Sequence, residues 1–378
     1  MAKKMVKLGD VATYINGYAF KPEDRGKIGL PIIRIQDLTG NSYDLGFYDG
    51  MYPQKIEINN GDILISWSAS LGVYIWNRGK ALLNQHIFKV EFDKMDIDKK
   101  YFVFAVRHKL KEMGRKTHGA TMKHIVKKDF DGTEIPYPPY KEQVEIANNL
   151  DKIFRIIELQ NQELKLLDEL VRSRFVELFG DPELNPMGWE KVTLNDVCSS
   201  IVRGPFGSAL KKEFFVEPSE TTYKVYEQKH AIQKSASIGT YYITQEKYRE
   251  LKRFECLPGD ILMSCSGTMG ELYQLPEGCE KGVINQALCK FTLNDKILPV
   301  CFLVYMQQTI GKLETKGSGI QNIAAVSYIK QMPINLPPME VQKKFERFVN
   351  QINKSKFGHL SMLTTIKSAY DQQTFIYP

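Results

Sequence analysis

The chain carries the same set of short motifs twice, in the same order, and this repeat constrains its fold more than any other feature. Residues 61–66 read Gly-Asp-Ile-Leu-Ile-Ser, and residues 259–264 read Gly-Asp-Ile-Leu-Met-Ser. A Leu-x-Asp-Val opening, an Asn-Gln pair and a Pro-Pro pair recur around them, starting at residues 8, 84 and 138 in the first copy and 194, 285 and 337 in the second. An internal repeat predicts two modules of one fold. Two such modules suit a ligand with two separated, similar parts, and duplex DNA is the obvious example because twofold-related modules read spaced half-sites.

Length and charge leave the class of protein open. A chain of 378 residues predicts two or three domains. The net charge of +7 permits a polyanion as a partner, but a slightly basic enzyme is an equally open interpretation. No run of about 18 apolar residues occurs in the sequence, so no membrane span is expected.

The six cysteines all lie in the second copy, and none forms a C-x-x-C pair. A tetrahedral zinc site requires closely spaced ligand pairs, so reduced thiols are favoured over a zinc site. Together with a start that carries no secretory signal pattern, these thiols predict a cytoplasmic protein.

Each copy begins with a β-rich part. Short runs of Ile, Val, Tyr and Phe are bounded by Gly, Asn and Asp, as at residues 31–35, 62–65 and 86–90. Amphipathic helices are expected near residues 101–113 and 300–313. This mixture predicts the α+β class for each copy.

A long helix is predicted after each Pro-Pro pair. Residues 141–179 contain neither Pro nor Gly, and their apolar residues follow heptad steps of 4 and 3 with polar interruptions at Gln160 and Arg174. The predicted seam comprises Leu150, Ile153, Ile157, Leu164, Leu167 and Val171 in the first helix and Phe345, Phe348, Ile352, Met362 and Ile366 in the second. The second seam is weaker because Ser355 and His359 occupy seam positions.

An apolar stripe of this length must be buried against something. We therefore expect the two helices to pair as an antiparallel coiled coil that separates two β-rich, pseudo-twofold-related modules in tandem. The alternative is that each helix packs on its own β-rich part.

No catalytic or cofactor motif stands out in the sequence. Residues 137–140, Tyr-Pro-Pro-Tyr, invite comparison with the Asn/Asp-Pro-Pro-aromatic loop of amino-methyltransferases, but a Tyr cannot accept hydrogen bonds from an exocyclic amine as that loop does. A rigid start of a helix is the better interpretation. No phosphate-binding glycine loop, no histidine pair spaced for a metal and no nucleophile–base constellation shared by both copies is present. We therefore predict no catalysis, no cofactor and no metal site.

The echoed positions carry groups that contact nucleic acids. Amides pair with adenine in the major groove, and hydroxyls and lysines contact phosphate. The predicted DNA-binding residues of the first copy are Arg34, Gln36, Ser66, Ser68, Ser70, Asn84, Gln85, His86, Lys116, Thr121 and Lys123. Those of the second copy are Arg203, Lys211, Lys212, Lys229, Ser264, Ser266, Thr268, Asn285, Gln286, Lys316, Ser318, Gln321 and Asn322. Buried turn amides, strand-end turn residues and a solvated charged loop stay open as structural interpretations of the same residues.

In their order, these motifs resemble the specificity (S) subunit of type I restriction–modification enzymes over essentially the whole chain. The matching features are the Leu-Gly-Asp-Val opening, the Gly-Asp-Ile-Leu-Ile-Ser strand, the Asn-Gln-His turn, the Gly-Ala-Thr-Met-Lys-His loop and the Ile-Pro-Tyr-Pro-Pro-Tyr-Lys-Glu-Gln start of a helix. Residues 188–194, Gly-Trp-Glu-Lys-Val-Thr-Leu, open the second copy as that family's second module opens. The second copy departs from the family pattern at Val341, where Glu is commoner, and in its Gly-Ser-Gly-Ile-Gln-Asn loop.

The resemblance implies two target recognition domains, residues 1–137 and 182–335, and two conserved spacer helices, residues 138–181 and 336–378. Each domain would read one half of a bipartite site in double-stranded DNA, and the helices would set the distance between the halves. The helices would also dock two methyltransferase (M) subunits and, through them, restriction (R) subunits, while the chain itself carries no catalysis. A two-headed scaffold for a partner other than DNA and a self-contained enzyme are the alternatives; S-adenosylmethionine binding to the isolated chain would favour the latter.

Overall fold

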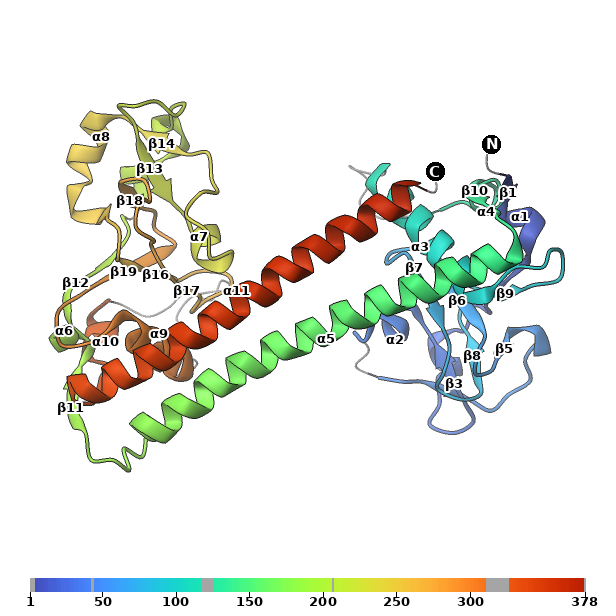
Figure 1. Cartoon of the computed structure of the whole chain (residues 1–378), viewed down its shortest axis with the longest axis horizontal. Coiled ribbons are helices and arrows are strands. Elements are labelled where there is room, and N and C mark those ends of the chain that lie inside the picture. Colours follow the sequence, from blue (N-terminus) through green and yellow to red (C-terminus); the bar gives the residue numbers. More distant parts are fainter. Residues whose placement is uncertain (1–3, 42–43, 117–124, 206, 311–325, 377–378) are drawn as a thin grey trace. The chain divides into compact units, whose positions relative to one another are not determined.

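The computed structural model describes residues 4–41, 44–116, 125–205, 207–310 and 326–376. Contacts between residues divide the chain into two units, Met1–Asn161 with Ser361–Pro378, and Gln162–Leu360. Each unit holds one β-rich copy and a part of each of the two long helices (Figure 1). No helix among the described residues is both long enough and apolar enough to cross a bilayer.

The first unit contains two four-stranded sheets and a two-stranded ribbon. Its strands are β1 (Met5–Lys7), β2 (Thr13–Asn16), β3 (Leu30–Ile33), β4 (Phe47–Tyr48), β5 (Glu57–Ile58), β6 (Ile63–Ser66), β7 (Gly72–Ile75), β8 (Ala81–Leu83), β9 (Ile87–Glu91) and β10 (Glu134–Pro136). Its short helices are α1 (Leu8–Val11), α2 (Ile35–Thr39), α3 (Lys99–Lys116) and α4 (Lys127–Asp131). The central sheet has the order β2-β9-β6-β7 and is antiparallel throughout. The second sheet has the order β4-β3-β8-β5, with β3 and β8 parallel, and β1 pairs with β10.

The second unit repeats this topology strand for strand. Its strands are β11 (Glu190–Thr193), β12 (Cys198–Arg203), β13 (Tyr223–Tyr226), β14 (Tyr242–Ile243), β15 (Glu255–Cys256), β16 (Ile261–Ser264), β17 (Leu272–Gln274), β18 (Gly282–Ile284), β19 (Leu288–Leu293) and β20 (Pro333–Leu336). Its short helices are α6 (Leu194–Val197), α7 (Gln228–Ile232), α8 (Gln245–Glu250), α9 (Pro299–Thr309) and α10 (Val326–Gln331). The sheet orders β12-β19-β16-β17 and β14-β13-β18-β15 match those of the first unit, and among the α-helices of the described residues only α8 has no counterpart there. The predicted repeat of one α+β module is therefore confirmed.

The Gly-Asp motif of each copy builds the turn before the buried strand β6 or β16. The glycines, Gly61 and Gly259, have φ values of 93° and 88°, a left-handed conformation that glycine adopts without strain. In the second copy, the Asp260 carboxylate accepts the Leu257 backbone N–H at 2.9 Å and pairs with Lys290 at 3.2 Å. The first copy has the same turn bond to Asp62, and Lys89 lies 3.6 Å from that carboxylate. The motif therefore holds the backbone of the central sheet.

The glutamine that follows each Pro-Pro pair locks the start of the long helix to the β-rich part. Gln143 is buried; its side-chain oxygen accepts the Asp98 N–H and its amide donates to the Pro138 carbonyl, both at 2.9 Å. Gln342 makes the equivalent bonds to the Leu298 N–H and the Pro337 carbonyl. This pair of buried amides explains why the motif recurs at the same place in both copies.

The two predicted long helices are α5 (Tyr140–Phe179) and α11 (Met339–Ile376). Every predicted seam residue of α5 is buried or half-buried, whereas the residues on the opposite face are exposed to solvent. In the second unit, Phe175 and Phe179 of α5 pack edge-on against Phe345 of α11, with ring centroids 5.5 and 5.3 Å apart. In the first unit, Phe154 of α5 packs against Tyr370 of α11 at 5.1 Å.

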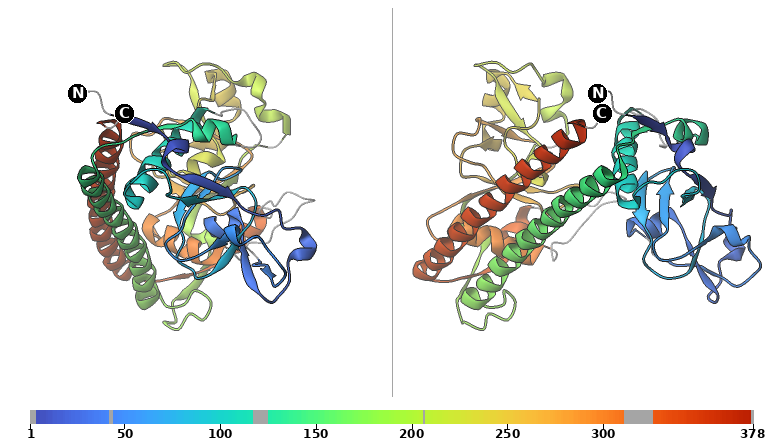
Figure 2. Two further views of the ribbon diagram at one scale, coloured as in Figure 1. Left: turned by 90° about the vertical axis from the view of Figure 1, so that its right-hand side faces the viewer. Right: turned by 45° about the vertical axis from the view of Figure 1, so that its right-hand side comes forward.

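Within the second unit, residue numbers rise along α5 as they fall along α11, from the Glu163–His359 contact through Asp168–Lys356 to Phe175–Phe345, so the helices pair antiparallel, as predicted (Figures 1 and 2). The helices also pack on the β-rich parts. The Phe154 ring of α5, for example, stacks on Phe104 of α3 with ring centroids 5.4 Å apart. Both predicted arrangements therefore hold in part: the helices pair with each other, and they also pack on their own β-rich parts.

One seam residue of α11 was predicted wrongly. Met362 is 49% exposed, and its neighbour Leu363 is 4% exposed. The predicted seam positions 345, 352, 359 and 366 do face inward. The second set of inward-facing positions lies four residues after each of the first three, at Val349, Lys356 and Leu363, and not three residues after them as predicted. Both choices satisfy a heptad in sequence, and the partner helix decides between them.

Candidate nucleic-acid interface

Three chain segments converge at the same place in each copy. They are the end of the first central strand, β2 or β12, the loop that joins the hairpin strands β6 and β7 or β16 and β17, and the turn that leads into β9 or β19. In the first copy, Gly17 N–H donates to Ile87 at 3.1 Å and Trp67 N–H donates to His86 at 3.2 Å. The second copy makes the same backbone bonds from Gly204 to Leu288 and from Cys265 to Ala287, at 3.0 and 2.7 Å. The two copies therefore share one backbone frame at this point.

The strand-end glycine is required by a close approach of two backbones. A Cβ atom on Gly17 would lie 2.0 Å from the carbonyl oxygen of Asn84, and one on Gly204 would lie 1.9 Å from that of Asn285. These two glycines were not predicted as part of the site. The signal that could have found them is a glycine directly after the first central strand in both copies.

The loop after β6 or β16 is held from inside by a buried serine. The Ser66 hydroxyl donates to the Ser70 carbonyl at 2.5 Å, and the Ser264 hydroxyl donates to the Thr268 carbonyl at 2.6 Å. One residue of this loop has a positive φ in each copy. It is Ala69, with φ of 57°, in the first copy and Gly267, with φ of 63°, in the second.

This arrangement corrects part of the predicted site. Ser66 and Ser264 are 0% exposed and Ser68 is 8% exposed, so the prediction that they contact DNA is wrong. The hydroxyls of Ser66 and Ser264 donate to carbonyls of the loop that follows them, and Ser68 is simply buried. The loop surface is instead formed by Ser70 and Thr268, which are exposed, and by Ser266, which is half-buried.

The Asn-Gln turn presents its second amide to solvent in both copies. Gln85 and Gln286 are exposed, whereas Asn84 and Asn285 are half-buried. Asn285 acts as a turn amide, because its side-chain oxygen accepts the Ala287 N–H at 3.1 Å. The Asn84 side-chain oxygen is buried and has no hydrogen-bond partner within the described part of the chain.

Most of the predicted cations lie elsewhere or are already paired. Arg34 caps α2 and pairs with the buried Asp37 at 3.2 Å, Lys229 pairs with Glu227 at 2.6 Å, and Lys211 lies 3.6 Å from Glu213. Lys211 and the exposed Lys212 precede the bridge from Val216 to the edge strand β14, so they belong to the second sheet rather than to the three-segment frame. Arg203, at the end of β12, lies next to Gly204 in the frame. Gln36 is exposed on α2.

Seven predicted residues cannot be placed in this frame. The side chains of Lys116, Thr121, Lys123, Lys316, Ser318, Gln321 and Asn322 lie outside the described residues. The first described residue after 117–124 is Ile125, whose N–H donates to the Trp67 carbonyl at 3.0 Å. The chain therefore returns from that segment directly at the loop of the first copy's frame.

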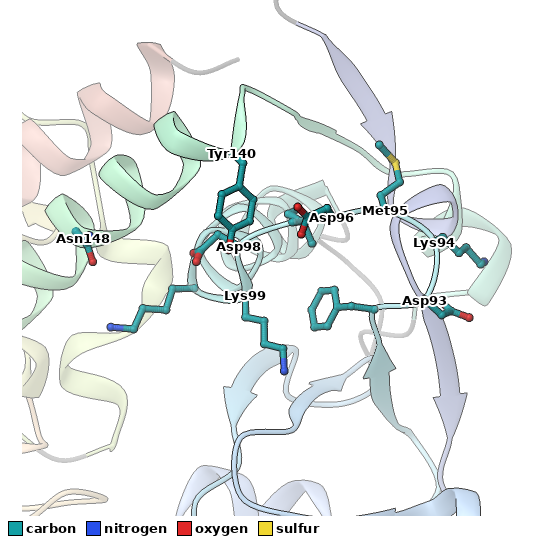
Figure 3. Close-up of a pocket in the computed structure, with 11 residues that line it drawn as sticks. Asp93, Lys94, Met95, Asp96, Asp98, Lys99, Tyr140 and Asn148 are labelled. Atoms are coloured by element: carbon teal, nitrogen blue, oxygen red, sulfur yellow. The ribbon is translucent and has the colours of Figure 1, made fainter.

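A second repeated surface lies where each long helix begins. In the first unit, an open depression of about 870 Å³ is lined by the 92–100 segment, Tyr140 and Asn148 (Figure 3). Its counterpart in the second unit, about 520 Å³, is lined by Trp189, Asp295, Lys296 and the Pro-Pro start of α11. Among the described residues no group of His, Cys, Asp or Glu side chains is arranged to hold a metal.

Comparison with known proteins matches this two-copy architecture. The family described as the type I restriction modification DNA specificity domain matches residues 2–169 and 186–358, so each copy matches once. The chain is 22% identical over 385 residues to the type I restriction enzyme EcoBI specificity subunit of Escherichia coli, covering 92% of this chain and 78% of that protein.

Two solved structures share the fold. The type I restriction–modification S subunit of M. genitalium aligns with a TM-score of 0.52 at 14% identity over 98% of this chain and 94% of its own. A chain from a study of complex assembly and conformational transition of the type I restriction–modification system aligns with a TM-score of 0.58 at 15% identity, covering 97% of this chain and 95% of that chain.

Two tandem specificity domains on paired long helices define a protein whose task is to recognise DNA sequence. The chain belongs to the type I restriction–modification DNA specificity family. It is a specificity subunit of that class and is itself non-catalytic.

Proposed function

We propose that each copy reads one half of a bipartite site in double-stranded DNA, with residues 1–137 and 182–335 as the recognition domains and residues 138–181 and 336–378 as the spacers. The observation that carries this proposal is the shared frame, in which an exposed amide and an exposed hydroxyl sit on matching loops of both copies. Amides and hydroxyls are the neutral groups that pair with base edges.

The proposed DNA-contacting residues are those that remain accessible or undescribed. They are Arg34, Gln36, Ser70, Asn84, Gln85, His86, Lys116, Thr121 and Lys123 in the first copy and Arg203, Lys211, Lys212, Lys229, Ser266, Thr268, Asn285, Gln286, Lys316, Ser318, Gln321 and Asn322 in the second. The lysines would contact phosphate and release counterions, so binding of the full chain to duplex DNA should weaken with salt at a log–log slope of roughly −5 to −8. An affinity that does not change with salt would argue against DNA as the ligand.

We place the docking surface for methyltransferase (M) subunits on the paired helices. Leu159, Leu166 and Leu170 are exposed on α5 with heptad spacing, outside the buried seam. An exposed apolar stripe of this kind suits a partner's helix. Two M subunits would bind the helix pair, R subunits would join through them, and the assembly would act on DNA in the cytoplasm.

The double variant Leu166→Glu with Leu170→Glu tests this docking surface. It should weaken association of the full chain with its M subunit at least tenfold in analytical ultracentrifugation, because burying two exposed leucines against a partner contributes about several kcal/mol. The matched control is Arg172→Gln, an exposed position on another face of α5. Unchanged association of the leucine variant, with unfolding temperature preserved, would place the M subunit elsewhere.

The helix pair would also fix the spacing between the half-sites. Inserting seven residues at matching levels of α5 and α11 keeps the heptad register and lengthens the pair by about 10 Å. The preferred spacer in selected duplexes should then lengthen by about three base pairs while both half-site sequences stay the same. A changed half-site sequence would contradict the division of labour between copies and helices.

A further inference from the structure

The two copies differ in the side chains that surround their common frame. The frame positions are identical: Gly17 and Gly204, Ser66 and Ser264, Asn84 and Asn285, Gln85 and Gln286. The positions next to them are not, since Asn16, Tyr18, Trp67 and His86 correspond to Arg203, Pro205, Cys265 and Ala287. Two readers built on one frame can gain different preferences from substituted positions such as these.

In the first copy, two members of the substituted set are exposed. Asn16 accepts the Trp67 indole N–H at 3.3 Å through its side-chain oxygen, and the other exposed member is Tyr18. It is 45% exposed, whereas its counterpart Pro205 is buried. The Tyr18 carbonyl accepts the Gln85 N–H at 2.9 Å, and Tyr18 forms a parallel bridge with Asn84. The tyrosine ring and the Gln85 amide are therefore carried by directly bonded backbone segments.

Aromatic contacts hold the Tyr18 ring and the residue that follows Gln85. The Tyr18 ring packs edge-on against Phe20 at 5.0 Å, and Phe20 packs against Tyr48 at 5.1 Å. On the other side of the turn, Trp67 packs edge-on against His86 at 4.9 Å and stacks on Phe88 at 5.5 Å. An exposed aromatic ring with this support keeps its orientation at little cost in side-chain entropy.

We propose that Tyr18 is a specificity-determining residue of the first recognition domain and that it reads an A·T base pair together with Gln85. A glutamine amide pairs with N6 and N7 of adenine in the major groove, and an apolar ring face fits the thymine methyl group of the same pair. Neither contact needs a charge. The second copy has Pro205 and Ala287 in the matching places, so its half-site lacks this preference. This inference rests on the proposed function.

The test is selection of bound duplexes from a library with two randomised blocks, using the full chain and its M subunit. The wild-type complex should enrich A·T at one position of the first block. Tyr18→Ala should reduce that enrichment about tenfold, because it removes one of the two contacts to that base pair. Tyr18→Phe keeps the ring and should keep the preference. Gln85→Ala should affect the same position, and Gln286→Ala should affect only the second block.

Gln54→Ala, an exposed amide outside the frame, is the matched control and should change neither block. The unfolding temperature of each variant shows whether the domain stays folded. The inference is overturned if Tyr18→Ala, folded as wild type, leaves the first block unchanged or weakens all sequences equally. Failure of the wild-type complex to enrich any two-part sequence is the separate result that overturns the proposed function as well.

Discussion

The first and second copies hold their backbones with the same residues but bury them differently. In the second copy, Asp260 and Lys290 form an ion pair in which both side chains are almost inaccessible, and Thr292 donates a further hydrogen bond to the carboxylate at 2.5 Å. In the first copy the equivalent pair of Asp62 and Lys89 is half-exposed and longer. The comparison shows that a repeated motif can fix the same backbone geometry in both copies while the folding stability of each copy depends on that motif to a different extent.

Removing the charge from each aspartate gives the largest expected contrast. Asp260→Asn leaves Lys290 buried without its counter-ion and should destabilise the chain by about 3–4 kcal/mol. Asp62→Asn should cost about 1 kcal/mol or less, because Lys89 is partly solvated and also bonds the Glu57 carbonyl at 2.9 Å. Urea unfolding of the full chain measures both values. Equal losses would show that burial does not separate the two copies.

The strand-end glycines should behave alike in both copies. Gly17→Ala and Gly204→Ala each place a methyl group inside the radius of a backbone carbonyl that cannot swing away. Each should cost about 2–3 kcal/mol, the usual range for overpacking. Gly358→Ala in α11 is the control, and it should change stability in the opposite direction. A Cβ at position 358 would meet nothing within 4 Å, and because Ala forms helix better than Gly, the variant should be more stable than wild type by up to about 1 kcal/mol. Tolerance of either strand-end substitution would contradict the close approach.

The seam of α11 can be tested with two adjacent residues. Leu363→Ala removes a buried side chain and should cost about 2 kcal/mol or more. Met362→Ala removes an exposed one and should change stability by no more than about 0.5 kcal/mol. Thermal unfolding of the two variants checks which residue faces the partner helix. A larger loss of stability for Met362→Ala than for Leu363→Ala would support the seam predicted from the sequence instead.

The smallest expected effect concerns the thiols, all of which lie in the second copy. None of the six forms a disulfide, and only Cys279 is not buried. Burial raises the pKa of Cys198 to about 12 and that of Cys301 to about 12, so both remain protonated at pH 8. Burial also raises the pKa of Cys279, but less of that side chain is covered. Iodoacetamide at pH 8 should therefore modify Cys279 first, as located by peptide mass spectrometry; equally rapid labelling of Cys198 would show that the core opens readily.

The repeat, the class of fold and the antiparallel helix pair could be predicted from the sequence because they depend on motif order and on heptad spacing. The seam of α5 could also be predicted, since only one set of heptad positions along this helix is apolar throughout. The companion line in α11 could not be, because Met362 and Leu363 are equally apolar and only the partner helix distinguishes them.

The candidate site was predicted in outline but not in detail. The Asn-Gln turns were predicted as DNA contacts without a distinction between their two residues, whereas the structure exposes the second residue and half-buries the first. Ser66 and Ser264 were misplaced because a hydroxyl after a strand can face solvent or cap its own loop. The proposed role of Tyr18 and the close approach at the two strand-end glycines could not be predicted, since both depend on backbone segments that meet only in the folded chain.

The most direct test of the account is the exchange of residues 1–137 for the corresponding domain of another specificity subunit, followed by selection of duplexes bound by the full complex. If each copy is an independent reader, the chimera will prefer a site in which one half has changed, while the other half and the spacer length are those of the parent. A change in both halves, or in the spacer, would contradict the account.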